Sequence, residues 1–153
     1  MKHNKLLFVV FAILLSMTAS AQVEINGIYY SLSSNGATVV HHDYCHYSGS
    51  IVIPSTVTYN NTIYKVTAIA SEAFVMDGIT SVSIGSNVKT IGSCAFQYCD
   101  ELTSVTIGSR VTTIGSNAFE RCINITSVKI PSSVTTIGEY AFRDCKALKS
   151  ATI

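Results

Sequence analysis

The stretch TTIGSNAFERC, residues 112–122, returns as TTIGEYAFRDC at residues 135–145, 23 positions later. The same framework occurs twice more upstream, so the chain carries four copies of one unit. The copies share a phenylalanine column and a closing isoleucine column: Phe74, Phe96, Phe119, Phe142, and Ile84, Ile107, Ile130, Ile153. A fixed period between roughly 20 and 50 residues is typical of stacked units that bury their apolar faces against one another. The sequence therefore predicts a solenoid of four coils of about 23 residues.

Within one unit, apolar positions suggest where each segment lies. Val105 and Ile107 alternate with polar residues, which predicts a strand with these two side chains inward. Ile114 indicates a second short extended segment on the opposite side of the coil. Residues 118–122 are expected to form a short helical or 3₁₀ turn, and Gly115 to provide a tight bend before it. Parallel strands of successive coils should then stack about 4.8 Å apart.

The units resemble leucine-rich repeats of the BspA-like type, whose pattern is similar to I-G-x-x-A-F-x-x-C-x-x-L-x-x-V-x-I-P. The similarity covers about residues 66–153, and Ile130-Pro131 supplies the closing proline, where the first two copies have Gly85 and Gly108. This resemblance implies a leucine-rich-repeat solenoid of the α/β horseshoe type, mostly β with short helical or 3₁₀ turns. It also implies adhesion to host extracellular matrix or to other cells.

Residues 22–65 have a different character and are expected to cap the first coil. Asn26-Gly27, Asn35-Gly36 and Asn60-Asn61 are flanked by β-rich arms, the typical signature of hairpin turns. Residues 53–65 should merge into the first coil, because Ile53-Pro54 has the pattern of a repeat end. A cap of this kind would cover the open apolar face of the repeat array.

The first 21 residues have the three parts of a secretory signal peptide. Lys2 and Lys5 precede an apolar run over residues 6–15, and Ala19-Ser20-Ala21 forms an A-x-A ending. The run is shorter than the roughly 20 residues of a membrane span, so no stable membrane insertion is expected after cleavage. Removal of Lys2 and Lys5 would leave eight basic against nine acidic residues, a net charge of −1. Without a basic patch, no nucleic-acid partner is expected.

Cys99, Cys122 and Cys145 follow the 23-residue step and should stack as a column. The spacing of coils would permit a disulfide, but three cysteines in one column cannot all pair. Zinc is disfavoured because no C-x-x-C pair or nearby histidine accompanies the column. The pattern favours an inert ladder of buried thiols, with Cys94 at a variable position and more exposed.

The segment HHDYCH is the one stretch that suggests a site of its own. It contains His41, His42, Asp43, Cys45 and His46, which are all residue types that bind metals. In a strand these side chains would alternate between two faces and would not converge on one ion. The favoured interpretation is a polar loop between cap strands, with these five residues as weak metal candidates and no cofactor expected.

The remaining candidate surface is formed by outward positions of the repeat strands. This surface is rich in hydroxyl groups and nearly uncharged, and it has no aromatic anchor of the kind that dominates binding energy. Its two columns are Ser81, Ser104, Ser127, Ser150 and Ser83, Thr106, Lys129, Thr152. Acidic residues are scattered over variable positions, and all mature histidines lie in one segment, so the sequence offers no catalytic constellation.

These features predict a secreted or cell-surface protein-interaction module that is not an enzyme. The host matrix or a cell-surface protein is the expected partner. An alternative is a truncated or structural repeat fragment with no ligand of its own. Lys146 and Lys149 mark the last repeat, which suggests either an edge guarded by lysines or an edge-to-edge dimer.

Overall fold

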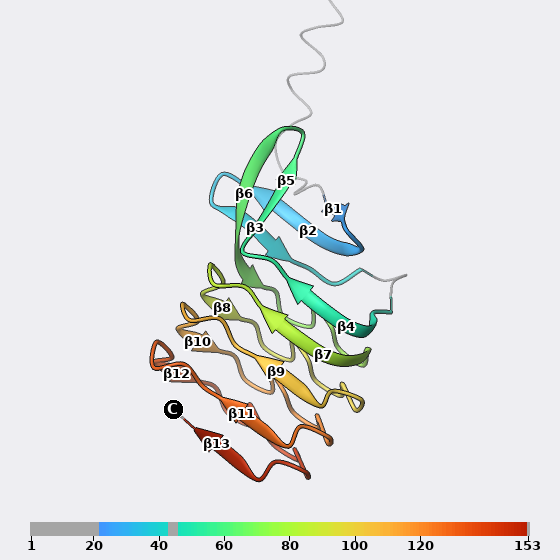
Figure 1. The fold of residues 1–153 in the computed structure, drawn as a ribbon, viewed down its shortest axis with the longest axis vertical. Helices are drawn as coiled ribbons and strands as arrows, with labels where there is room; N and C mark the ends of the chain where they lie inside the picture. The colour runs from blue at the N-terminus through green and yellow to red at the C-terminus, as the bar shows by residue number, and fades with distance from the viewer. Residues whose placement is uncertain (1–21, 43–45, 153) are drawn as a thin grey trace, which may run out of the picture.

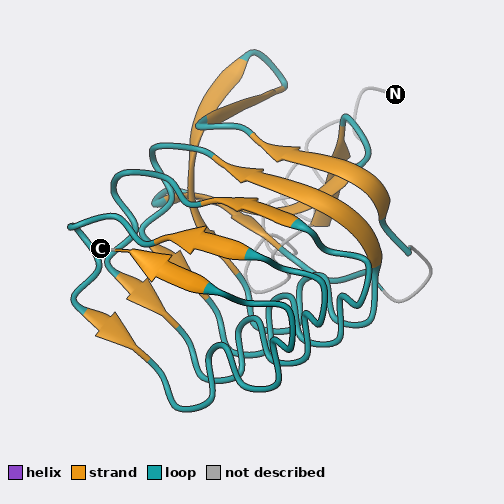
Figure 2. Cartoon of the chain, turned by 60° about the horizontal axis from the view of Figure 1, so that its bottom comes forward, coloured by secondary structure: helices purple, strands orange, loops and turns teal. Residues whose placement is uncertain are grey.

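The computed structural model describes residues 22–42 and 46–152, which form two stacked β-sheets joined by turns (Figures 1 and 2). The cap-side sheet consists of β1 (Gln22–Ile25), β2 (Ile28–Ser33), β3 (Gly36–Val39), β5 (Thr56–Tyr59), β6 (Thr62–Ile69), β8 (Thr90–Ile91), β10 (Thr113–Ile114) and β12 (Thr136–Ile137). The other sheet consists of β4 (Ser48–Ile53), β7 (Gly78–Ile84), β9 (Ser104–Thr106), β11 (Ser127–Lys129) and β13 (Ser150–Thr152).

The 23-residue repeat sets the register of both sheets. On one side Thr113 of β10 pairs in parallel with Thr90 and Thr136. On the other side Ser127 of β11 pairs in parallel with Ser150. Each repeat therefore contributes one short strand to each sheet, and the predicted coil with two extended segments is confirmed.

The turns between the two sheets differ from the expectation. Residues 118–122 were expected to be helical, but the described residues contain no helix, and this part of the α/β horseshoe prediction is wrong. Asn117 and Arg121 both have φ of 59°, which interrupts a right-handed helix. The backbone N–H groups of Asn117 and Phe119 donate to Glu139 and Ala141 of the next coil, at 2.9 and 2.8 Å. The alternate N–H groups, those of Ala118, Glu120 and Cys122, bond to the oxygen three residues back within the turn. The i→i−4 bonds of an α-helix are therefore not formed.

A stack of phenylalanine rings runs through the centre of the molecule. Successive ring centroids of Phe74, Phe96, Phe119 and Phe142 lie 5.0, 5.1 and 5.2 Å apart, with interplanar angles of 10° or less. The first three rings are fully buried, and Phe142 in the last coil is partly buried. This spacing follows the distance between parallel strands, so one ring per coil fills the core continuously.

Beside the rings, the cysteine column forms a ladder of hydrogen bonds. The thiols of Cys99, Cys122 and Cys145 donate to the backbone oxygens of Phe74, Phe96 and Phe119, one coil earlier, at 3.0, 3.1 and 3.1 Å. All three cysteines are free, as is Cys94. Burial raises the pKa of the Cys99 thiol to about 12. The column is therefore made of neutral thiols that act as small core side chains.

The N-terminal part is built from hairpins. The β1–β2 and β5–β6 turns fall at Asn26-Gly27 and Asn60-Asn61, as predicted. The β2–β3 turn was expected at Asn35-Gly36, but its two turn residues are Ser34 and Asn35, one position earlier. Gly36 begins β3 with φ of 125°, and a Cβ there would stand 2.5 Å from the backbone oxygen of Lys65.

Tyr47 joins this part to the repeats. Its ring packs edge-on against Phe74, with centroids 4.9 Å apart, and continues the phenylalanine stack. Its backbone N–H donates to Oδ1 of Asp77 at 3.1 Å, and its hydroxyl accepts from the N–H of Tyr29. Asp77 is 3% exposed and stands three residues after Phe74, where later coils carry the ladder cysteine. The Asp77 carboxylate accepts a hydrogen bond because its neighbour is the N–H of Tyr47, whereas each ladder cysteine donates its thiol hydrogen to a backbone carbonyl oxygen.

Gly115 serves close packing and not the bend that the sequence suggested. Its φ lies outside the left-handed region. A Cβ built on Gly115 would stand 2.6 Å from the backbone nitrogen of Ser93, one coil earlier. Gly92 and Gly138 meet the preceding coil in the same way. The repeated glycine is thus required by the approach of two backbones.

Candidate functional site

The strand face is the outer surface of the sheet β4-β7-β9-β11-β13, and it is the surface that the sequence singled out. Val82, Val105 and Val128 point inward from successive strands and are at most 8% exposed. Because side chains alternate along a strand, the residues on either side of each valine point outward. The fold therefore brings the two predicted columns together on one surface.

All eight predicted residues lie on this face. Ser81 is half-buried, and the others are exposed: Ser83, Ser104, Thr106, Ser127, Lys129, Ser150 and Thr152. Parallel pairing places Ser81 opposite Ser104, Ser83 opposite Thr106, and Lys129 opposite both Thr106 and Thr152. Whether a ligand contacts these columns stays a prediction.

Two residues of the strand face were missed by the sequence analysis. β4 pairs in parallel with β7, so Ser50 stands opposite Ser81 and Val52 opposite Ser83. The hydroxyl of Ser81 donates to that of Ser50 at 2.8 Å. The signal was present, because SIVIP at 50–54 matches SVKIP at 127–131. The strand face consequently extends from β13 to β4.

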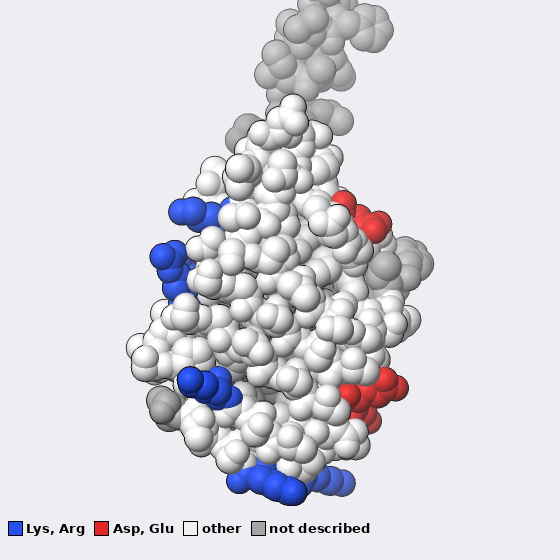
Figure 3. Space-filling view, viewed as in Figure 1, with Lys and Arg blue, Asp and Glu red and all other residues white. Residues whose placement is uncertain are grey.

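The chemistry of the strand face is dominated by hydroxyl groups. Lys129 carries the one charge in the two columns, and Val52, 64% exposed, is their one large apolar side chain. On this side of the molecule Lys and Arg lie at the left and along the bottom end, and Asp and Glu lie at the right, so the central area is largely uncharged (Figure 3). Such a surface can exchange hydrogen bonds with a partner over its length but holds no catalytic base.

A shallow groove interrupts the face where β9 and β11 end. It encloses about 490 Å³ and is lined by Thr106, Ser109, Lys129, Pro131 and Ser132 among others. Pro131 follows the repeat pattern that Gly108 breaks one coil earlier, so this groove is specific to one pair of coils. It combines one ammonium group with several hydroxyls and could accept a small polar group of a partner.

The HHDYCH segment does not assemble a centre in the described residues. His42 stacks on Tyr29, with ring centroids 3.9 Å apart, while His46 places Nδ1 3.5 Å from Oδ1 of Asp77. His41 is half-buried, and Asp43 and Cys45 lie outside the described residues. Within the part of the chain that is described, no three His, Cys, Asp or Glu side chains gather as a metal-binding group.

Asp77 is the most perturbed acid near this segment. Burial raises the pKa of its carboxyl group, while the Tyr47 N–H and the His46 side chain act in the opposite direction. Oδ2 of Asp77 has no hydrogen-bond partner among the described residues. Its single strong bond joins two parts of the fold, which indicates a structural role.

On the turn side, aromatic and arginine side chains pair with one another. Arg121 lies over the ring of Tyr98 at 5.2 Å, and Arg143 over Tyr140 at 5.0 Å. Glu120 accepts hydrogen bonds of 2.6 Å from the side chains of Gln97 and Asn117, which lower its pKa. Some of these contacts join neighbouring coils and others lie within one coil. The charged and aromatic side chains of the turn side are therefore already paired with each other inside the molecule.

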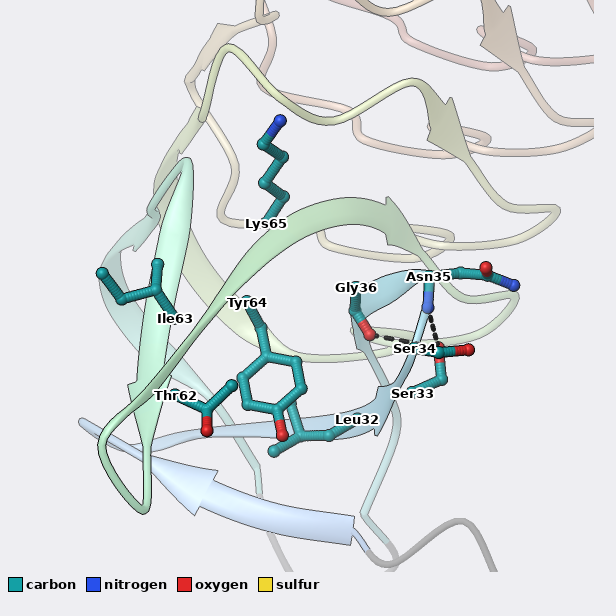
Figure 4. Close-up of a pocket in the computed structure, with 9 residues that line it drawn as sticks. All are labelled: Leu32, Ser33, Ser34, Asn35, Gly36, Thr62, Ile63, Tyr64 and Lys65. Carbon is teal, nitrogen blue, oxygen red and sulfur yellow. Dashed lines mark hydrogen bonds between the residues drawn. The ribbon is translucent and has the colours of Figure 1, made fainter.

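A further hollow of about 660 Å³ lies between the β2–β3 turn and the β5–β6 hairpin (Figure 4). Leu32 and Tyr64 both line it, while the side chains of Ile63 and Lys65 point away from them. The hydroxyl of Ser33 donates to the oxygen of Gly36 at 3.2 Å and accepts from the N–H of Asn35. These bonds hold the turn, and the lining offers no acid or histidine.

Comparison with known proteins identifies the family to which the repeats belong. The family model described as "BspA type Leucine rich repeat region (6 copies)" matches residues 67–153, more than half of the chain. No curated protein matches the sequence. Among the described residues, no helix is long and apolar enough to cross a membrane.

Solved structures agree with this match. A leucine-rich repeat protein from Bacteroides capillosus is 26% identical, with a TM-score of 0.73 over 86% of this chain and 96% of that protein. One from Bacteroides ovatus is also 26% identical, with a TM-score of 0.66, and 86% of this chain covers 41% of that protein. The leucine-rich repeat protein of T. pallidum, 24% identical over 86% of this chain and 71% of its own length, shares the fold with a TM-score of 0.66.

Proposed function

Because the chain belongs to the BspA-type leucine-rich repeat family, we propose that it is a secreted or cell-surface module that adheres to host extracellular matrix or to other cells. Leucine-rich repeat domains generally mediate protein–protein interaction. The partner in this proposal is a matrix or cell-surface protein, and the chain has no catalytic role. The binding surface is the strand face.

One observation carries the choice of surface. From Ser50 in β4 to Ser150 in β13, one outward serine occurs on every strand of the same sheet. The column beside it is hydroxylated except at Val52 and Lys129. A continuous, sparsely charged surface of this kind exposes hydrogen-bonding groups without pairing them internally, apart from the bond between Ser81 and Ser50.

Export belongs to the same proposal. A signal peptide over residues 1–21, which lie outside the described residues, would deliver the protein through the membrane. The family match supports this localisation, because BspA-like repeat proteins are typically surface or secreted bacterial proteins. Amino-terminal sequencing of the exported protein should begin at Gln22.

The test is a binding screen of the purified protein against immobilised matrix proteins and intact cells. Ser127→Arg places a bulky charge in the middle of the strand face and should abolish any binding found. Ser93→Arg makes the same change at an exposed position of the turn side and should leave it intact. No binding at high micromolar concentration, or equal loss in both variants, would remove the support for adhesion through this face.

A further inference from the structure

Among the described residues, no strand pairs with the outer edge of β4. β4 is the terminal strand of its sheet and pairs with β7 alone. No backbone group of residues 48–53 bonds to any described segment beyond that pairing. A strand edge in this state presents a row of N–H and C=O groups with which another strand can pair.

This edge forms one wall of a groove of about 650 Å³. The opposite wall is the β1–β2 turn with Asn26 and Gly27. Between the two walls lie Ile28, Tyr30 and Val57, which are at most 6% exposed and belong to the core. The groove lining includes β4 residues from Ser48 to Val52, so its length follows the strand.

The composition of the lining restricts what can enter the groove. None of its residues is Asp, Glu, Lys or Arg, and His46 is the one histidine. Ile28, Tyr30 and Val57 lie deep, while Ser48, Ser50 and the exposed Val52 lie at the exposed side of the strand. An occupant matching this pattern is uncharged toward the groove and can alternate apolar and polar side chains.

We propose that this groove binds an extended, uncharged peptide segment of a partner protein by β-strand addition to β4. The added strand pairs its backbone with the free edge. Its inward side chains pack on Ile28, Tyr30 and Val57. Its outward side chains continue the strand face by one more strand, so the groove is continuous with that face but does not depend on a ligand there.

A second copy of the chain fits the groove less well than a peptide segment. The β1–β2 turn of each copy lines the groove beside β4, so pairing of the β4 strands of two copies would have to accommodate both turns. The outer strand β13 has just three residues, whereas β4 offers six, so these two edges of neighbouring copies match poorly in length. A separate extended segment can match the full length of β4.

The experiment uses a synthetic peptide of sequence Lys-Thr-Val-Thr-Val-Thr-Lys, blocked at both ends. It is titrated into the ¹⁵N-labelled protein, and amide hydrogen exchange is measured at each residue. Strand addition should slow exchange at residues 48–53 and leave the amides of β9 and β11 unchanged. Two further peptides carry N-methyl groups, one on every valine and the other on every threonine.

Only alternate residues of a strand face a given neighbour, so the two methylated peptides should behave differently. One should bind like the parent, and the other should bind at least about tenfold more weakly because its lost hydrogen bonds leave β4 groups unpaired. Equal binding of both, or protection outside β4, would overturn the proposal. Sedimentation of the peptide-free protein tests whether a second copy of the chain occupies the groove. A dimer in which the amides of residues 48–53 are protected would also overturn the proposal.

Side-chain variants give an independent check. Val52→Lys changes an exposed residue of the groove, and Ile63→Lys makes the same change at an exposed residue of the β5–β6 hairpin outside it. Val52→Lys should weaken the peptide, since the added strand would lie against this side chain and partly desolvate its ammonium group. Ile63→Lys should not. The Ser127→Arg variant, which tests the strand face, should bind the peptide normally, so the two proposals can fail separately.

Discussion

At the scale of single residues, contacts between successive coils decide what each position tolerates. The glycine after each inner isoleucine illustrates this, because a side chain at Gly115 would enter the backbone of the preceding coil. Gly78 has an ordinary φ as well, but the atoms nearest to a Cβ there lie 3.8–4.0 Å away. The two glycines thus differ in the space that is available for a Cβ atom and not in their backbone conformation.

Gly115→Ala should therefore destabilise the fold, and Gly78→Ala should not. Because backbone atoms cannot step aside as a flexible side chain can, we expect Gly115→Ala to reduce the free energy of unfolding by about 1–3 kcal/mol. Gly78→Ala serves as the control and should remain within about 0.5 kcal/mol of the parent. Urea unfolding followed by circular dichroism measures both. Equal stability of the two variants would contradict the close-approach explanation.

Asp77 is the residue whose ionisation opposes folding. Burial is the main cause of its raised pKa, so the folded state binds a proton more tightly than the unfolded chain does. Stability from this group is therefore full below the pKa of an unfolded carboxyl, about 4, and is lost as pH rises through the folded value. The Tyr47 N–H, the His46 side chain and His41 act against this shift, and Cys99 also interacts electrostatically with Asp77.

Asp77→Asn should remove this pH-dependent contribution to the free energy of unfolding. The free energy of unfolding of the variant, relative to the parent, should increase as pH rises from about 4 toward neutrality. The Asn amide can still accept from the Tyr47 N–H, so the connection to the repeats is retained. Asp100→Asn, an exposed acid one coil further, is the control and should give a flat difference. A flat difference for Asp77→Asn as well would show that its burial has no thermodynamic effect.

At the scale of elements, the repeat strands and two of the three hairpin turns could be predicted from the sequence, and the conformation of the turns between the two sheets could not. Period-two alternation around Val105 identified both the strand and its outward residues, because burial on one side of a sheet enforces that alternation. The turn at residues 118–122 has no comparable signal. Asn117 and Arg121 adopt φ near 60° without being glycine, and their conformation follows from hydrogen bonds to a coil 23 residues away.

The same reasoning explains which parts of the candidate surface were found. The columns of β7, β9, β11 and β13 follow directly from the repeat. Ser50 and Val52 escaped because β4 precedes a hairpin and lies outside the aligned copies. The β4 groove could not be predicted at all, since its two walls come from segments that meet only in the fold.

The cysteine ladder leads to a prediction about reactivity. The thiolate is the reactive form, and burial raises the pKa of Cys99 to about 12 and that of Cys122 further. Cys94 and Cys145 are only partly buried. Among the four described cysteines, alkylation of the native protein should label Cys94 first, then Cys145, and Cys99 and Cys122 only after unfolding. Mass spectrometry of the digested protein gives the order, and a Cys99–Cys122 disulfide would contradict the ladder.

At the scale of the whole molecule, the two ends of the stack are covered to different degrees. At the first coil, Tyr47 closes the phenylalanine stack, and Tyr30 of β2 is 1% exposed. At the last described coil, Ile137 is 45% exposed, and Phe142 and Leu148 are partly buried. β12 and β13 are the terminal strands of their sheets within the described residues (Figure 1). Apolar side chains and open strand edges therefore coincide at this end.

This coincidence predicts weak association of the polypeptide through its last coil, opposed by Lys146 and Lys149. Both lysines are exposed, and two copies meeting there would bring like charges together. Static light scattering should show a mass that rises with concentration and with added salt, because salt screens the repulsion. The Lys146→Asp, Lys149→Thr double variant should associate more strongly than the parent, and Ile137→Lys more weakly. If all three proteins keep one constant monomer mass over the same concentrations, the end is neither guarded by its lysines nor a dimerisation edge.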